Sequence, residues 1–276
     1  MFLMINTLSS EFQLFIKIFL FITGLCVGSF LNVCIYRIPL EKSIVFPSSG
    51  CPNCKEKLQP RDMIPVLGYI FLRGKCRNCK EPISIQYPVV ELMTGIIWLI
   101  VYLRYGLTAE TAALLFLYTV LIPVTFIDLK HMIIPNGLVL TGLAGGIVIF
   151  LYHILYKPFS LYDSTKWYTP ILGMFSASGI LLVIAIIGLL IYGDDGAMGM
   201  GDVKLFIPIG LFLGWKLTLL ALFFSIMIGG IISIILLIFR IKDRKSAIPF
   251  GPFIVIATML TGLYGNQILN WYLNFF

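Results

Sequence analysis

The sequence predicts an all-α polytopic membrane protein with about eight transmembrane helices and a small cytoplasmic domain between the first and second helices. Three observations support this fold class. Hydrophobic residues make up 59% of the 276 residues and charged residues only 12%, with a mean hydropathy of +0.98, far above the range of soluble globular proteins. Long apolar runs recur along the chain, and basic residues gather in a few segments between these runs.

Seven apolar runs are expected to cross a hydrocarbon core of about 30 Å, which takes about 20 residues. An eighth run, residues 203–214, is shorter and follows directly after Asp202. The first run lacks a preceding basic segment and a small-residue cleavage site, so we interpret it as a retained helix and not as a signal peptide. The seven long runs cover residues 12–36, 88–102, 109–127, 134–156, 170–192, 217–239 and 253–276.

Basic residues predict the orientation of these spans. Nine of the 20 Lys and Arg residues lie within 37–80, and four more lie between the last two long runs, namely Arg240, Lys242, Arg244 and Lys245. Because Lys and Arg concentrate in cytoplasmic loops, both segments are expected to be cytoplasmic. Counting spans from one segment to the other, the two basic segments lie on the same side of the membrane only if residues 203–214 also cross it. We therefore expect eight spans, with both termini outside. The net charge of +7 is explained by this concentration of basic residues in cytoplasmic loops and by their attraction to anionic lipids, so no nucleic-acid partner is expected.

The segment between the first two spans contains two Cys-x-x-Cys motifs. Cys51 and Cys54 form the first, and Cys76 and Cys79 form the second after 21 intervening residues. This spacing predicts a four-thiolate zinc site. The surrounding 50 or so residues are poor in apolar side chains, so metal binding would supply much of their folding energy. A disulfide pair or reduced thiols is the alternative, although a cytoplasmic location disfavours disulfides.

Ionisable residues within or beside membrane spans are candidates for function, because burying a charge in lipid costs at least a few kcal/mol. The candidates are Lys17, Glu91, Asp128, Asp194, Asp195, Asp202 and Lys204. Lys17 lies near a span end and is expected to extend its amine into water. Asp194 and Asp195 lie in a glycine-flanked loop and are interpreted as solvated acids. Glu91, at the start of the second span, is expected to form a loop ion pair or part of a polar pocket.

Asp128 and Asp202 form the strongest candidate site. One ends a span and the other begins one, and the predicted topology puts both on the cytoplasmic face at similar depth. Two carboxylates that come close share one proton, so one can accept a proton from water while the other polarises a peptide carbonyl. Gly199 and Gly201 would let an extended substrate approach Asp202 closely. The pattern therefore indicates aspartic proteolysis at the membrane boundary.

Two other classes of function remain open from these residues. In a transporter or channel, the two aspartates would relay protons or bind cations. In a membrane scaffold, the cysteine domain would dock a cytoplasmic partner and the aspartates would be structural. Inverted repeats would favour transport, but the sequence contains no convincing internal duplication.

The order of motifs along nearly the whole chain resembles that of the bacterial type IV prepilin leader peptidases, a GxGD family of membrane aspartic peptidases. The motifs that carry this resemblance are Gly28-Ser29-Phe30-Leu31-Asn32-Val33 with Arg37; the two cysteine pairs; Leu72-x-Gly74-x-Cys76; Ile83-Ser84; Tyr87-Pro88-x-x-Glu91; Asp128-Leu129 leading to Ile134-Pro135; Gly201-Asp202-Val203-Lys204-Leu205; and Pro249-Phe250-Gly251-Pro252-Phe253.

The resemblance implies a bifunctional enzyme of the bacterial cytoplasmic membrane. Such enzymes cut the basic leader from prepilins and pseudopilins on the cytoplasmic side, and many then N-methylate the new terminal residue with S-adenosylmethionine. The catalytic positions match Asp128 and Asp202, and Gly199, Gly201 and Lys204 would form the substrate-binding loop. The implied domains are 1–36, a first span with the family signature; 37–87, a zinc domain associated with methyl transfer; and 88–276, the peptidase.

Some positions depart from the family pattern, and no standard methyltransferase fingerprint is present. Asn136 stands where the family often has Asp, so a mechanism that needs a third carboxylate there is in doubt. Gly68 replaces a frequent Ser. The chain lacks a Rossmann-type glycine loop, so Glu91 and Gly74 are the candidates for methyl transfer. The sequence does not identify the oligomeric state.

Overall fold

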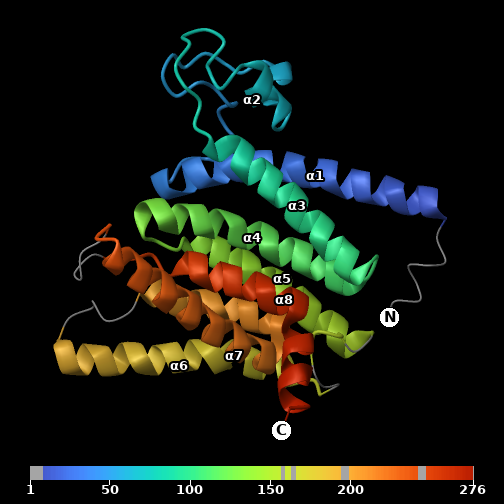
Figure 1. Cartoon of the computed structure of the whole chain (residues 1–276), viewed down its shortest axis with the longest axis vertical. Helices are drawn as coiled ribbons and strands as arrows, with labels where there is room; N and C mark the ends of the chain where they lie inside the picture. Colours follow the sequence, from blue (N-terminus) through green and yellow to red (C-terminus); the bar gives the residue numbers. More distant parts are fainter. Residues whose placement is uncertain (1–8, 157–158, 163–165, 194–198, 242–246, 276) are drawn as a thin grey trace. The chain divides into compact units, whose positions relative to one another are not determined.

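The computed structural model describes residues 9–156, 159–162, 166–193, 199–241 and 247–275, and it is helical with no strands in these ranges (Figure 1). Two compact units divide the chain at Met1–Thr111 and Ala112–Phe276. Seven of the described helices are long and apolar enough to cross a membrane. The predicted fold class, an all-α polytopic membrane protein, is therefore confirmed.

The first unit contains two long helices, α1 (Ser10–Arg37) and α3 (Gln86–Tyr105), which pack against each other. Glycines bring their backbones close together: a Cβ on Gly24 would lie 2.8 Å from the Gly95 Cα, and a Cβ on Gly28 would lie 2.7 Å from the Glu91 Cα. Small residues four apart permit this close approach of membrane helices. The segment between α1 and α3 forms only short helices, η2 (Ile38–Leu40), η3 (Pro60–Met63) and α2 (Leu67–Phe71).

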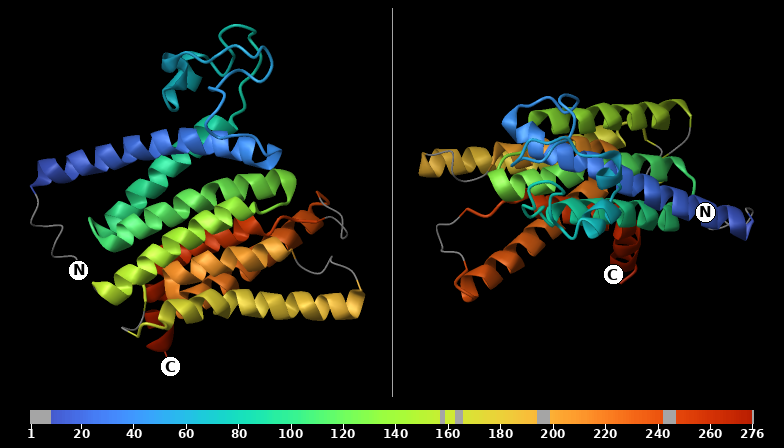
Figure 2. Two further views of the ribbon diagram at one scale, coloured as in Figure 1. Left: turned by 180° about the vertical axis from the view of Figure 1, so that it is seen from behind. Right: turned by 90° about the horizontal axis from the view of Figure 1, so that it is seen from above.

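The second unit is built around α7 (Met200–Ile238), which packs against α5 (Asn136–Leu155), α6 (Thr169–Tyr192) and α8 (Gly251–Leu273). Figure 2 shows these helices alongside α7 from two further directions. The remaining helix, α4 (Ala109–His131), contributes large buried side chains, and its Tyr118 hydroxyl donates to the Met259 carbonyl oxygen of α8 at 3.2 Å.

The long helix α7 is broken at Gly214, whose φ of 71° and ψ of 172° lie outside the helical region. Only glycine adopts such angles without strain. Two side chains bond carbonyl groups around the break: the Tyr162 hydroxyl donates to Leu211, and the Thr218 hydroxyl donates to Gly214. The break separates a short arm, 200–213, from a long arm, 215–238. It lies at the boundary that the sequence predicted for the end of its short eighth span.

The observed helices begin and end within a few residues of the predicted spans. Several residues that the sequence analysis singled out, as candidate acids or as topology signals, lie outside the described parts of the chain. These are Asp194 and Asp195 in one connection, and Lys242, Arg244 and Lys245 in another. The orientation of the spans in the membrane therefore stays a prediction.

Close contact between α6 and the short arm of α7 leads to a stability prediction. A Cβ on Gly173 of α6 would lie 2.3 Å from the Gly210 carbonyl oxygen, and a backbone atom cannot move away as a flexible side chain could. Gly173→Ala should therefore destabilise the fold by about 1–3 kcal/mol and lower the Tm in detergent by roughly 2–10 °C.

The matched control is Gly179→Ala in the same helix, because a Cβ there meets no atom within 4 Å. Alanine is the better helix former, so this variant should keep or raise the Tm. Equal Tm values for the two variants would contradict the close helix contact.

Candidate functional site

Asp128 lies in the last turns of α4 and is buried, with 5% of its surface exposed. Its Oδ2 atom accepts a hydrogen bond of 2.8 Å from the backbone N–H of Gly251, the first residue of α8. A side chain at Gly251 would collide with the carboxylate, since its Cβ would lie 2.6 Å from Oδ2. The start of α8 thus holds the Asp128 side chain in one orientation.

Asp202 lies in the first turn of α7, where Gly199 is the N-cap residue. The Asp202 backbone N–H donates to the Gly199 carbonyl oxygen at 3.1 Å, and a Cβ on Gly199 would lie 3.1 Å from the Asp202 Oδ2 atom. Gly201 faces Ile134, with 3.1 Å between its added Cβ and the isoleucine Cβ. Gly199 therefore leaves room beside the half-buried carboxylate, and Gly201 lets the start of α7 lie close to Ile134.

Asp128 and Asp202 are close enough for the charge of one to act on the other. The two residues lie 74 positions apart in the sequence, on different helices, and both belong to the second unit. The structure thus brings together the two carboxylates that the sequence analysis singled out. Such a pair supports general acid and base chemistry on a bound peptide.

Lys204 and Asn136 form a polar contact beside this pair. The Lys204 ammonium donates to the Asn136 Oδ1 atom at 3.4 Å, and both side chains are exposed. Asn136 begins α5, and Lys204 lies two residues after Asp202. The amide therefore accepts a bond from a cation at the position where the sequence analysis noted a missing carboxylate.

The four paired cysteines of the first unit form a compact cluster. Their sulfur atoms all lie within 4.8 Å of one another, with Cys51 and Cys79 at 3.8 Å and Cys54 and Cys76 at 4.0 Å. Four thiolates about 2.3 Å from a tetrahedral zinc would lie about 3.8 Å apart. The cluster is therefore compatible with a structural zinc ion, and all four thiols are free of disulfides.

The two cysteine pairs adopt the same local fold. In each, the first cysteine accepts a backbone bond from the lysine four residues later and donates to the glutamate five residues later, as Cys51 does with Lys55 and Glu56. Lys55 and Lys80 both have positive φ. Backbone N–H groups of Cys79 and Asn78 lower the pKa of the Cys76 thiol to about 7, which favours the metal-binding thiolate near neutral pH.

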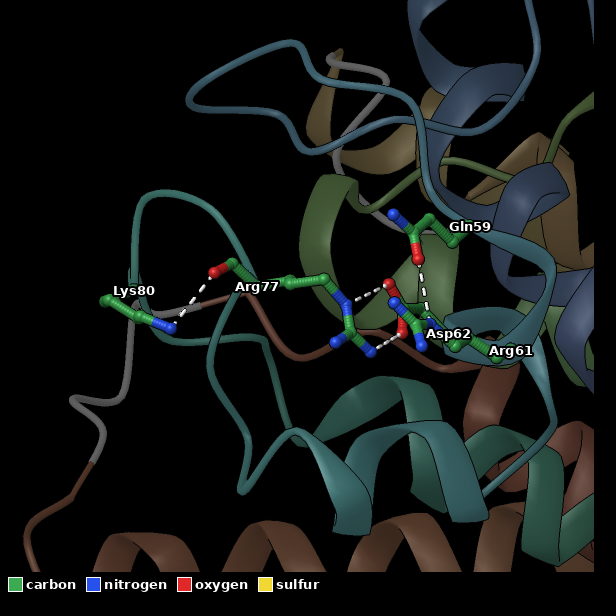
Figure 3. Close-up of polar contacts among 5 residues, drawn as sticks. All are labelled: Gln59, Arg61, Asp62, Arg77 and Lys80. Carbon is green, nitrogen blue, oxygen red and sulfur yellow. Dashed lines mark hydrogen bonds and ion pairs between the residues drawn. The ribbon is translucent and has the colours of Figure 1, made fainter.

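An ion pair holds the second cysteine loop against η3. Figure 3 shows the Arg77 guanidinium donating to both Asp62 oxygens, with Nε 3.0 Å from Oδ2, while Lys80 donates to the Arg77 carbonyl oxygen at 3.0 Å. These bonds from Arg77 hold the pKa of the Asp62 carboxyl below its usual value. Gly68 packs against the same turn, and its added Cβ would lie 2.3 Å from the Asp62 carbonyl oxygen, so no side chain fits there.

The two methyl-transfer candidates have different environments. Gly74 has a φ of 68°, and a Cβ there would lie 2.9 Å from the Tyr69 hydroxyl oxygen, so its residue type is required by the backbone. Glu91 is buried in α3, and its Oε2 atom accepts the Val66 backbone N–H at 2.7 Å. No described hydrogen bond joins Gly74 to Glu91. Of the two environments expected for Glu91, the loop ion pair is absent from the described residues, and its role in a polar pocket stays a prediction.

Sequence analysis missed three groups in these sites. The Gly251 N–H was overlooked although a glycine directly before a proline at the start of an apolar run is a helix-start signal. Asn32 was noted only as part of a motif, although a polar residue inside an apolar run could have identified it. Nothing in the local sequence indicates that Val66 donates its backbone N–H to Glu91.

Comparisons with known proteins agree with this arrangement of sites. Residues 22–105 match the model of the Bacterial Peptidase A24 N-terminal domain, and residues 115–234 match the Type IV leader peptidase family. Three relatives share the name prepilin leader peptidase/N-methyltransferase. They come from Bacillus subtilis (35% identity; 92% of this chain and 96% of the relative), Aeromonas hydrophila (34%; 93% of each) and Legionella pneumophila (32%; 99% of each). No solved structure matches the chain.

Proposed function

The chain belongs to the type IV leader peptidase family, and we propose that it cleaves the leader from prepilins or pseudopilins and N-methylates the new terminal residue. The family resemblance that the motifs indicated is thereby confirmed. The observation that carries the peptidase proposal is the juxtaposition of Asp128 and Asp202 in the second unit. The family relationship favours this function over the transporter and the scaffold.

The two carboxylates would act as a unit on the scissile peptide. The ionised member accepts a proton from water, and the resulting hydroxide attacks the peptide carbonyl carbon while the protonated member donates to the carbonyl oxygen. Collapse of the tetrahedral intermediate breaks the C–N bond, and a proton passes to the leaving amine. The Gly251 N–H supports this role because it fixes the orientation of Asp128.

The residues around Asp202 fit a substrate-binding loop. Gly199 and Gly201 carry no side chains that would block an extended peptide, and the Lys204 ammonium lies on the exposed side near Asn136. A prepilin consists of a basic leader followed by an apolar helix. The helix can enter the bilayer while the leader remains in water, so the scissile bond lies at the boundary where these aspartates are expected.

We propose the cytoplasmic membrane of a bacterium as the location, with segment 37–87 on the cytoplasmic side. This segment would hold a structural zinc ion through Cys51, Cys54, Cys76 and Cys79, and residues 88–276 would form the peptidase domain. S-adenosylmethionine would be the methyl donor, and Glu91 is the candidate for receiving the terminal amine. Gly74 would contribute by shaping the turn that precedes the second cysteine pair.

Removing the charge of either proposed catalytic aspartate tests the peptidase. Asp128→Asn and Asp202→Asn should each lower the cleavage rate by about 10²- to 10⁴-fold, because each amide keeps the shape but cannot transfer the proton. The measurement is shortening of a prepilin by purified protein in detergent. Asp62→Asn makes the same change in the first unit and should leave cleavage near the wild-type rate. Retained cleavage in either proposed catalytic variant would exclude the dyad.

The role of the α8 start is tested by Gly251→Ala. The added methyl group would force the Asp128 carboxylate to move, and a displacement of about 1 Å can cost about 100-fold in rate. We expect kcat to fall on this scale with a smaller change in KM. Gly230→Ala is the control, because a Cβ there meets no atom within 4 Å. An unchanged kcat for Gly251→Ala would show that this contact does not set the position of Asp128.

Metal analysis tests the zinc proposal. We expect one zinc ion per chain, and Cys54→Ser or Cys79→Ser should lose this metal and expose segment 37–87 to proteolysis, because few apolar residues hold it together. Cys26→Ser, outside the cluster, should keep the zinc. A metal-free protein whose cysteines resist alkylation until reduced would instead indicate disulfides.

A further inference from the structure

The first unit contains two buried polar side chains, Asn32 and Glu91, where α1 packs against α3. Asn32 of α1 is 2% exposed and Glu91 of α3 is 7% exposed. Gly28 lies one turn before Asn32 and packs against Glu91, and Tyr87 lies one turn before Glu91 and bonds Asn32. The two buried polar side chains therefore occupy adjacent turns of the same helix pair.

The carboxylate of Glu91 has hydrogen-bond donors but no cation. Its bonds come from the Val66 backbone N–H at 2.7 Å and from the Ser29 hydroxyl. Among the described residues, no Lys, Arg or His forms an ion pair with it. A buried carboxylate without a counter-ion is costly in a membrane helix, and such residues usually have a functional partner.

The backbone that bonds Glu91 is held in an unusual conformation. Val66 has a φ of 61°, a region that β-branched residues rarely adopt. Backbone strain of this kind persists where the surrounding structure requires it and concentrates at functional sites. Here it directs a neutral N–H donor toward the buried carboxylate.

Asn32 presents an acceptor that nothing satisfies. Its Nδ2 group donates to the Tyr87 carbonyl oxygen at 3.0 Å and to the Gly28 carbonyl oxygen at 3.3 Å. Its Oδ1 atom is buried and has no hydrogen-bond partner among the described residues. Leaving a buried amide oxygen unpaired is destabilising. The α1–α3 contact thus combines an unpaired carbonyl oxygen with an uncompensated carboxylate.

We propose that Asn32 and Glu91 together form a pocket that binds a primary ammonium group. An ammonium carries three donors and one positive charge, which match the carboxylate of Glu91 and the free oxygen of Asn32. This inference rests on the proposed methyl transfer, which brings two such groups to the enzyme. One is the new N-terminus of the cleaved substrate, and the other is the α-amino group of S-adenosylmethionine.

The test compares each amine with its acetylated form in the wild-type protein. One pair of probes is a synthetic peptide with the mature N-terminal sequence of a substrate, with a free or an acetylated α-amine. The other pair is S-adenosylhomocysteine and its N-acetyl derivative. Binding is measured by calorimetry in detergent. One free amine should bind about ten- to a hundredfold more tightly than its acetylated form, and the pair that shows this preference identifies the source of the ammonium.

Two variants test whether the preference for the free amine arises at the proposed pocket of Asn32 and Glu91. Glu91→Gln keeps the acceptor for Val66 but removes the charge, so it should abolish the preference for the free amine. Thr94→Val is the matched control: Thr94 is also buried, one turn away, and its hydroxyl bonds only the Val90 carbonyl oxygen among the described contacts. This variant should keep the preference.

The pocket proposal is overturned if neither free amine binds better than its acetylated form in the wild-type protein, or if Glu91→Gln keeps a full preference. The wild-type comparison decides the matter even if Glu91→Gln fails to fold. Mass spectrometry of a prepilin treated with wild-type protein and S-adenosylmethionine tests the proposed function separately. A protein that cleaves and methylates the prepilin but shows no preference for a free amine would refute the pocket proposal and leave the proposed function intact.

Discussion

The structure depends on the requirement that every backbone polar group within a bilayer find a partner inside the protein. Helix ends and breaks are where this requirement is hardest to meet, because their N–H and C=O groups have no helical partner. Side chains supply the missing bonds at two such places: Asp128 accepts the Gly251 N–H, and Tyr162 donates to Leu211 near the break in α7. Outside the predicted spans, Val66 donates its N–H to Glu91 in the same way. The same bonds that satisfy the backbone therefore orient two of the candidate functional carboxylates.

Glycine contacts make these arrangements possible. Gly24 and Gly28 let α1 approach α3, while Gly173 and Gly210 let α6 approach the short arm of α7. In lipid the hydrophobic effect does not favour one helix pair over another, so close van der Waals contact has a larger share in fixing the packing. Since Asp202 begins the short arm, the contact between Gly173 and Gly210 also restricts where that carboxylate can lie.

The sequence predicted the features that depend on local pattern. Apolar run length predicted the helices of residues 109–131 and 169–192 closely, and the spacing of Cys51, Cys54, Cys76 and Cys79 predicted their clustering. The boundary between the short and the long apolar run was also predicted close to the observed break at Gly214, while the separate crossing of the short run stays a prediction. These predictions succeed because bilayer thickness and metal geometry act on short stretches of chain.

Contacts between distant segments could not be predicted in this way. The bond from Gly251 to Asp128 spans 123 residues, and the bond from Val66 to Glu91 requires a positive φ at a valine, which local propensity disfavours. The unpaired Oδ1 of Asn32 is visible only once both bonds of its amide nitrogen are known. Sequence motifs thus selected the candidate residues, while their partners required the fold.

The division into two units suggests why one chain can carry two reactions. The paired aspartates and the helix start that orients Asp128 all belong to the second unit, and the cysteine cluster, Glu91 and Asn32 all belong to the first. The two matched family models, 22–105 and 115–234, fall within the same two units. Each set of groups is positioned by contacts within its own unit, so substitutions that remove one chemistry need not disturb the packing that supports the other.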